Sequence, residues 1–207
     1  MGNCYISRRV GDGSSGESHT LPSDYTAIDY VICGDGTIGQ SGFTLYNVDI
    51  SNQNYIDIIT TTPTTNSESA FIGNGNSWEG YYQDYYQDYE LRAYSGLSYV
   101  SNSWTTVDNG VIKNNTRFQF TPTVSSFYPF HIGYYSKGNY KYKGRIYSVI
   151  ISIPILNSNG TTTNREKVLN HLVPCIRDSD NCVGMFDLIC QVFYFSDSDL
   201  DPFVAPT

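Results

Sequence analysis

Short runs of alternating apolar and polar residues recur along most of the chain, separated by turns rich in Gly, Asn, Ser and Pro. A period of two indicates half-buried strands, and close spacing of such runs is typical of an all-β domain. The pattern therefore predicts an all-β fold. The predicted strands are Ala27–Cys33, Thr44–Ile50, Asn54–Thr61, Ser69–Ile72, Tyr86–Tyr94, Gly96–Ser101, Ser103–Asp108, Val111–Lys113, Thr116–Thr121, Phe130–Tyr135, Lys141–Ile153, Leu172–Ile176, Met185–Asp187, Gln191–Phe195 and Phe203–Ala205.

Two neighbouring segments stand apart from this general pattern. The run Arg145–Ile155 is apolar at nearly every alternate position and predicts a central strand of the core. Asn164–Asn170 is the one good helix candidate, and Asn157–Thr163 before it is predicted to be an exposed turn.

The closing segment Leu172–Tyr194 is predicted to fold as strand, turn and strand. Apolar residues at its two ends bracket the polar stretch Arg177–Asn181. Within it, Gly184 lies where a strand can bend, and Asp187 lies where a short acceptor can cap a turn.

This segment, LVPCIRDSDNCVGMFDLICQVFY, resembles the end of a family of concanavalin A-like (laminin G-like) jelly-roll domains of gut bacteria and their phages. Leu21–Val31 followed by Asn54–Asp57 is similar to the opening of those domains. His131–Gly133 with Lys143–Val149 is similar to their penultimate hairpin.

The resemblance implies an antiparallel β-sandwich of jelly-roll (concanavalin A-like) type over residues 21–207, with a hairpin rather than a helix before the closing segment. The chain departs from the family pattern by an insertion between Tyr30 and Tyr55 and by the aspartate-rich tail Ser196–Pro202. Both departures fall in predicted loops, so they bear on binding more than on the fold.

Length and charge narrow the class of protein further. The 207 residues fit one all-β domain, and only 15% of them are charged. The formal net charge of −8 disfavours a nucleic-acid partner, because phosphate binding needs a basic surface. No apolar run approaches the length needed to cross a bilayer, so no membrane partner is expected.

Residues 1–20 are predicted to form an N-terminal arm and linker outside the domain. Gly11–Ser18 has the composition of a flexible linker, and the strand-capable piece Cys4–Val10 precedes it. Two interpretations stay open: a free tail, or an arm that pairs with a sheet edge of another subunit. The candidate docking residues of the arm are Tyr5, Ile6, Arg8, Arg9 and Val10.

Cysteine spacing and aspartate spacing give no metal site. The five cysteines form an odd set without the paired spacing of a zinc site, which favours buried free thiols. Asp197, Asp199 and Asp201 alternate like the start of a calcium loop, but Pro202 stands where the turn glycine belongs, so a solvated acidic turn is favoured. No cofactor is predicted, although calcium in other loops stays open, since relatives of the broad fold bind it there.

Enzymatic activity is not predicted. Glycoside hydrolases of this fold carry an E-x-D-x-x-E strand, and no glutamate of this chain has a second carboxylate at that spacing. Of the three histidines, His19 lies in the linker, whereas His131 and His171 are predicted to pack in the fold rather than serve a nucleophile.

The tandem repeat YYQDYYQDY at Tyr81–Tyr89 concentrates aromatic side chains. It is interpreted either as a loop that packs its rings over a sheet or as a sugar-binding platform, because tyrosine combines an apolar ring with a polar tip. Burial is the stronger alternative for Trp104, whose strand neighbours are threonines. The glycan-binding candidates are Trp78, Tyr81, Tyr85, Arg92 and Trp104.

Three roles compete: a structural and adhesive protein on the surface of a phage virion, an exported bacterial carbohydrate-binding protein, and the disfavoured hydrolase. The N-terminal sequence has no apolar core typical of a secretory signal, which favours a head or tail fibre or decoration protein made in the host cytoplasm. The expected partners are other virion proteins, further copies in a homo-oligomer such as a trimer, and host or mucosal glycans.

Overall fold

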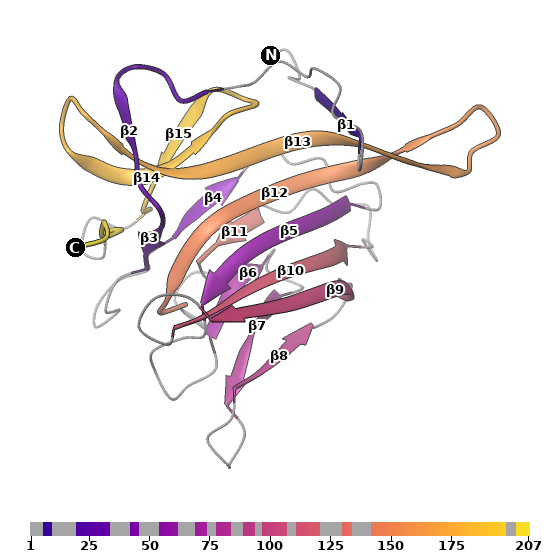
Figure 1. Cartoon of the computed structure of the whole chain (residues 1–207), viewed down its shortest axis with the longest axis horizontal. Coiled ribbons are helices and arrows are strands. Elements are labelled where there is room, and N and C mark those ends of the chain that lie inside the picture. Colours follow the sequence, from indigo (N-terminus) through magenta and orange to yellow (C-terminus); the bar gives the residue numbers. More distant parts are fainter. Residues whose placement is uncertain are drawn as a thin grey trace.

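In the computed structural model the described residues form two antiparallel sheets, one of ten strands and one of five (Figure 1). No helix occurs in the part of the chain that the structure describes. The predicted all-β antiparallel sandwich is therefore confirmed, whereas the jelly-roll connectivity stays a prediction from the resemblance. The described residues are 6–9, 20–33, 42–45, 54–61, 69–73, 78–83, 89–93, 97–106, 111–120, 130–133, 142–197 and 202–207, with β1, β7 and β8 described by their backbone alone.

The large sheet is built around two long neighbouring strands, β12 and β13. Three short strands add to them: β1 (Ile6–Arg9) and β2 (Tyr25–Ala27) pair with β13, and β3 (Val31–Ile32) pairs with β12. The main strand order is β15 (Val192–Phe195), β14 (Cys182–Asp187), β13 (Thr162–Arg177), β12 (Arg145–Leu156), β5 (Asn54–Thr61), β10 (Ile112–Phe120) and β9 (Leu97–Thr106).

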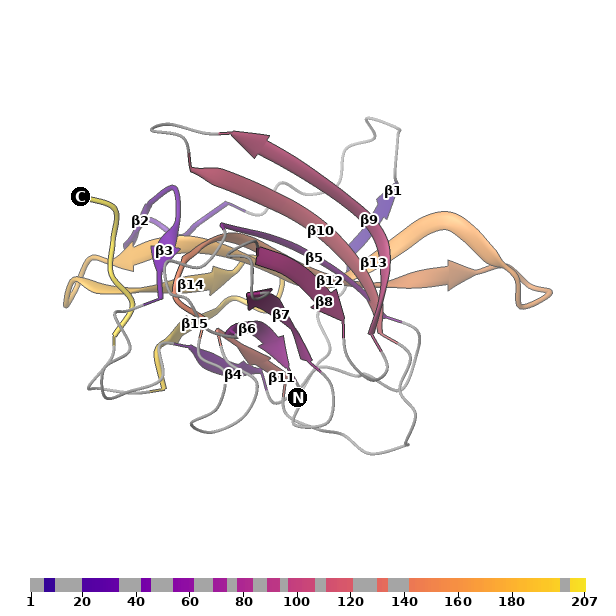
Figure 2. The same ribbon diagram turned by 90° about the horizontal axis from the view of Figure 1, so that it is seen from below.

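The small sheet lies against one face of the large sheet (Figure 2). Its order is β4 (Phe43–Leu45), β11 (Phe130–Ile132), β6 (Ser69–Gly73), β7 (Trp78–Gln83) and β8 (Tyr89–Ala93). Side chains of both sheets fill the space between them. This main core includes Phe43, Leu45, Ile72 and Ile132 of the small sheet and Ile56, Ile58, Phe118, Ile146, Val149 and Ile151 of the large one.

Alternation along β5 shows how the sequence builds this arrangement. Ile56 and Ile58 are buried in the main core, while Tyr55 and Asp57 are half-buried on the opposite face. Since successive side chains of a strand point to opposite faces, one strand supplies both the core and the outer surface.

The central-strand prediction for Arg145–Ile155 is confirmed. The segment forms β12, which lies between β13 and β5. The prediction of Asn54–Thr61 matches β5 residue for residue. Phe203–Ala205, in contrast, forms no strand and contributes a single bridge between Ile32 and Val204.

The helix prediction for Asn164–Asn170 is wrong, because this segment lies inside β13. Its backbone pairs with β12 along one edge and with β1 along the other, and this pairing outweighs a weak local helix preference. The hairpin implied by the family resemblance is present instead. Its turn is exposed, and the Asn157 Oδ1 atom accepts hydrogen bonds from the N–H groups of Asn159 and Thr161.

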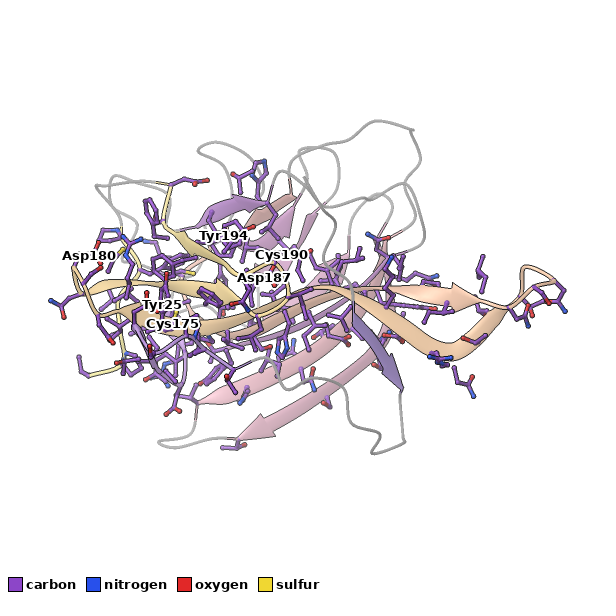
Figure 3. The ribbon with its side chains drawn as sticks, turned by 90° about the horizontal axis from the view of Figure 1, so that it is seen from above. Tyr25, Cys175, Asp180, Asp187, Cys190 and Tyr194 are labelled. Atoms are coloured by element: carbon purple, nitrogen blue, oxygen red, sulfur yellow. The ribbon has the colours of Figure 1, made fainter. Side chains whose placement is uncertain are left out.

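The closing segment forms β14 and β15 as predicted, and the Asp187 prediction is confirmed (Figure 3). The buried carboxylate of Asp187 accepts hydrogen bonds from the side chain of Asn170 at 2.6 Å and from the backbone N–H groups of His171, Ile189 and Cys190 at 2.9–3.3 Å. It thereby links β13 to the β14–β15 turn.

The predicted bend at Gly184 is wrong, since β14 keeps regular pairing with both neighbours through this residue. Glycine is required at this position because there is no space for a side chain. A Cβ atom there would lie 2.2 Å from the backbone oxygen of Tyr194 and 2.6 Å from the ring of Phe193.

All four cysteines in the described part of the chain are free thiols. Cys33 and Cys175 are buried, as predicted, and Cys182 and Cys190 are half-buried. Cys4 lies outside the described residues.

Candidate functional site

The outer face of the large sheet, turned away from the small sheet, carries the most concentrated polar and aromatic chemistry of the described residues. Its part over β12, β5 and β10 is called here the open half. The part over β2, β13, β14 and β15 is called the closing half. Most of the side chains of the open half that are discussed below are half-buried, so their ring faces and polar tips are partly accessible.

Four residues of the open half form a continuous stack, the tyrosine ladder: Arg145, Tyr30, Tyr147 and Lys113. The guanidinium carbon of Arg145 lies 4.5 Å from the ring centroid of Tyr30. The rings of Tyr30 and Tyr147 are 5.2 Å apart, and the Lys113 Nζ atom lies 4.1 Å from the Tyr147 ring. Each cation is thus positioned over an aromatic face.

Strand pairing explains why these residues meet. Val31 and Ile146 are register partners in the pairing of β3 with β12, and both are buried in the main core. Their sequence neighbours Tyr30, Arg145 and Tyr147 must then project from the opposite face. Lys113 reaches the same face from β10, where its neighbour Asn114 is buried.

Within the described ranges, no carboxylate lies at ion-pair distance from Lys113 or Arg145. Lys113 and Arg145 thus place two positive charges on one pair of contacting rings, although the whole chain has a formal net charge of −8.

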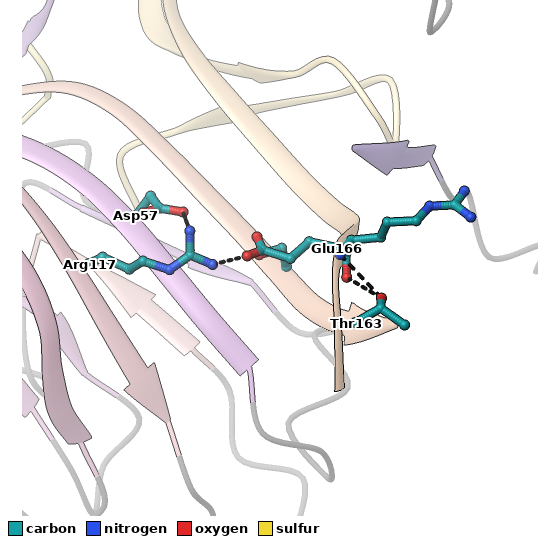
Figure 4. Close-up of polar contacts among 6 residues, drawn as sticks. Asp57, Arg117, Thr163 and Glu166 are labelled. Atoms are coloured by element: carbon teal, nitrogen blue, oxygen red, sulfur yellow. Dashed lines mark hydrogen bonds and ion pairs between the residues drawn. The ribbon is translucent and has the colours of Figure 1, made fainter. Parts of the chain in front are cut away.

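In a second group of the open half, the Arg117 network, the single cation is paired with two carboxylates (Figure 4). The guanidinium of Arg117 forms ion pairs with Glu166 and, at 3.4 Å, with Asp57. Glu166 also accepts a hydrogen bond of 2.8 Å from the buried hydroxyl of Ser152, and Arg117 lies 4.3 Å from the ring of Tyr55. The network joins β10, β5, β12 and β13, and its one cation is already paired with carboxylates.

The structure places the sequence-based glycan candidates only by the strands on which they lie. Trp78 and Tyr81 lie on β7 and Arg92 on the neighbouring β8, at the end of the small sheet. Trp104 lies on β9, the end strand of the large sheet, and Tyr85 lies outside the described residues. Their role in binding stays a prediction.

The candidate docking residues Ile6, Arg8 and Arg9 lie on β1, which pairs with β13. Tyr5 and Val10 lie outside the described residues. Residues 6–9 of the arm are therefore paired with an edge of the large sheet.

Sequence reasoning missed the tyrosine ladder. A signal was available, because Tyr30 and Tyr147 are each next to a predicted core position of a strand. That signal becomes specific only when the two strands are known to be neighbours.

The two described histidines are His131 and His171. His131 is buried, and its Nδ1 atom lies 3.2 Å from the Thr44 hydroxyl, which donates to Asp197. Asp197 thereby ties the segment after β15 to β4, while Asp199 and Asp201 lie outside the described residues.

A search of the described residues finds no group of three or more side chains arranged to hold a metal ion. The same residues include no helix long and apolar enough to span a membrane.

Comparisons with known proteins add no identity: no family model, curated protein or solved structure matches the chain.

Proposed function

We propose that this protein is a non-enzymatic adhesive β-sandwich on the surface of a phage virion, and that it binds glycans through the tyrosine ladder. One observation supports the binding part above all others. Two contacting tyrosine rings carry two cations that no described carboxylate neutralises.

The chemistry of the ladder suits a sugar. The apolar face of a pyranose ring packs on an aromatic ring, while hydroxyl and ammonium groups at the edge form hydrogen bonds with its hydroxyls. Lys113 and Arg145 add charge-assisted donors, which favour glycans bearing a carboxylate or a sulfate. Such contacts are shallow, so weak individual affinity raised by multiple copies is expected.

Placement on a virion is supported by the resemblance of the closing segment to domains of gut bacteria and their phages, and by the arm ahead of the sandwich. Other virion proteins and further copies of the chain are the partners of this proposal. The alternative is an exported bacterial carbohydrate-binding protein. Neighbouring capsid, portal or tail genes would support the virion role, whereas polysaccharide-import genes would support the alternative.

Binding is tested with a glycan array followed by titration of the best ligand. Tyr147→Ala and Arg145→Gln are expected to weaken binding by tenfold or more, about the loss of one stacking or charge-assisted contact. Arg117→Gln is the matched control, because this arginine lies on the same face but is already paired. Equal loss in Arg145→Gln and Arg117→Gln would contradict the proposed site.

The same titration tests whether the candidate residues of the small sheet bind the glycan. Binding that survives Tyr147→Ala but is lost when Tyr81→Ala is combined with Tyr85→Ala would assign the glycan site to the tyrosine repeat. An array without any bound glycan would reject both sites and leave a purely structural role.

A further inference from the structure

The edge of β13 continues past the point where β14 leaves it. β14 pairs with β13 from Arg177 to Leu172, and β1 then occupies the same edge from Val168 to Arg165. The register is antiparallel, with Ile6 opposite Val168, Ser7 opposite Lys167, Arg8 opposite Glu166 and Arg9 opposite Arg165.

The edge of β13 at Arg165–Val168 has the properties of an edge that a further strand stabilises. With β1 paired beside it, Val168 is only 7% exposed, and it belongs to neither hydrophobic cluster of the described residues. Without a strand beside it, the β13 backbone would also present unpaired N–H and C=O groups, which a fold normally avoids. The edge therefore accepts a strand of four residues.

Within the described part of the chain, β13 is the only strand that pairs with β1. The sequence between Arg9 and Tyr25 is rich in Gly and Ser. A linker of this length spans up to about 50 Å when extended, which is enough to reach a neighbouring molecule.

The acceptor edge lies at the base of the β12–β13 hairpin, which projects beyond the rest of the large sheet (Figures 1 and 2). This hairpin exposes apolar surface that the single chain leaves uncovered. Leu156 is 56% exposed, and Ile153 and Ile155 are half-buried. A second copy held here by its arm would bury this surface in addition to filling the edge.

We infer that the Arg165–Val168 edge is a strand-acceptor site, and that the β1 arm of a second copy of the chain fills it in an arm-exchanged oligomer. Arm exchange keeps every β1–β13 contact of the single chain. The only added free-energy cost is therefore that of association, and burial of the apolar surface of the projecting hairpin offsets it. The inference is independent of glycan binding, because the ladder and the acceptor edge share no residue.

Disulfide trapping between two singly substituted full-length proteins tests the exchange. Ser7→Cys in one protein and Lys167→Cys in the other place thiols at directly opposed positions, about 4.5–5.5 Å apart between Cα atoms, which suits a disulfide. Both proteins also carry Cys4→Ser, so that the native arm thiol cannot react. The proteins are mixed at high concentration, oxidised, and analysed by non-reducing electrophoresis and peptide mass spectrometry.

A covalent dimer joined through positions 7 and 167 is the expected result. Thr163→Cys replaces Lys167→Cys in the control, because position 163 lies on the same strand but outside the β1 register, and this pair should stay unlinked. The inference is overturned if the mixture yields no dimer while a single chain carrying both substitutions closes its own disulfide, since the arm would then pair only within one molecule.

The mass of the full-length protein in solution provides the second measurement. Light scattering should give an oligomer that Arg8→Pro converts to a monomer, since proline removes a backbone donor and disrupts β1. The melting temperature of the sandwich should change little. An Arg8→Pro protein that keeps the wild-type mass would contradict arm exchange.

Discussion

The two halves of the outer face of the large sheet differ sharply in chemistry although they share the long strand pair β12–β13. In the closing half, a second hydrophobic cluster of Cys175, Phe186 and Leu188 covers the face, with Tyr25 and Phe193 packed against it. In the open half, the tyrosine ladder and the Arg117 network leave rings and charges partly accessible. Burial in one half serves stability, and accessibility in the other leaves room for a ligand.

Cations illustrate the difference. In the closing half, Arg177 lies 4.8 Å from the ring of Phe193, and two hydrogen bonds of 2.6 and 3.0 Å tie it to Asp180. The hydrogen bonds from Arg177 hold the pKa of the Asp180 carboxyl below its usual range. In the open half, Lys113 and Arg145 contact rings without such a partner in the described residues, so they can still engage an anionic group.

The largest expected effect is a difference in destabilisation between one substitution in the closing half and one in the open half. Phe186→Ala, at a side chain 3% exposed, should lower the free energy of unfolding by about 3–5 kcal/mol, because it opens a cavity in the second cluster. Tyr147→Ala in the ladder should cost about 1 kcal/mol, since its ring is only half-buried. Guanidinium unfolding curves measure both, and equal costs would remove the distinction between the halves.

Gly184→Ala should cost about 2 kcal/mol, because the added Cβ atom clashes with the backbone of Tyr194 and the ring of Phe193. Gly160→Ala is the control. It has open space for a Cβ atom and is strained only by its φ of +80°, so its cost should be about 1 kcal/mol. A Gly184→Ala protein as stable as the wild type would show that β14 and β15 separate easily, contrary to a tightly packed closing half.

Alkaline pH should weaken the large sheet where β13, β14 and β15 pack. Burial raises the pKa of the Cys175 thiol to about 12 and that of the Tyr194 phenol to about 12, from ordinary values of 9.0 and 10.0. Both groups favour the folded state in their neutral forms. This stability is complete below their unfolded pKa values and is lost as the pH rises toward 12.

Unfolding curves at pH 8 and pH 11 should therefore differ by roughly 3–4 kcal/mol, with the larger share from Cys175. Combining Cys175→Ala with Tyr194→Phe should reduce this difference, because neither titrating group remains. A pH dependence unchanged by the double substitution would place its origin elsewhere in the chain.

Arg117→Met should have a small effect on stability, about 1 kcal/mol, since the network is partly solvated. The loss arises because Asp57 and Glu166 would keep their charges without the guanidinium between them. Adding Glu166→Gln should restore part of the stability, as a double-mutant cycle would measure. No recovery would mean that the network acts through packing of the arginine stem alone.

Local sequence was sufficient for several of the strands and for the capping role of Asp187. Alternation of apolar and polar residues defines two faces for each strand, and this rule depends only on the backbone geometry of a strand. It predicted β5 and the central position of β12 correctly. It failed at Asn164–Asn170, where pairing along both edges of β13 decided the conformation.

The candidate site could not be predicted in the same way. Tyr30 and Tyr147 contact each other because β3 pairs with β12, and Lys113 reaches Tyr147 across the intervening strand β5. Alternation determines on which face a side chain lies, but it carries no information about which distant strand lies beside it. Strand pairing is set by the packing of the whole core, so only the tertiary structure brought the ladder together and left its two cations without a described acidic partner.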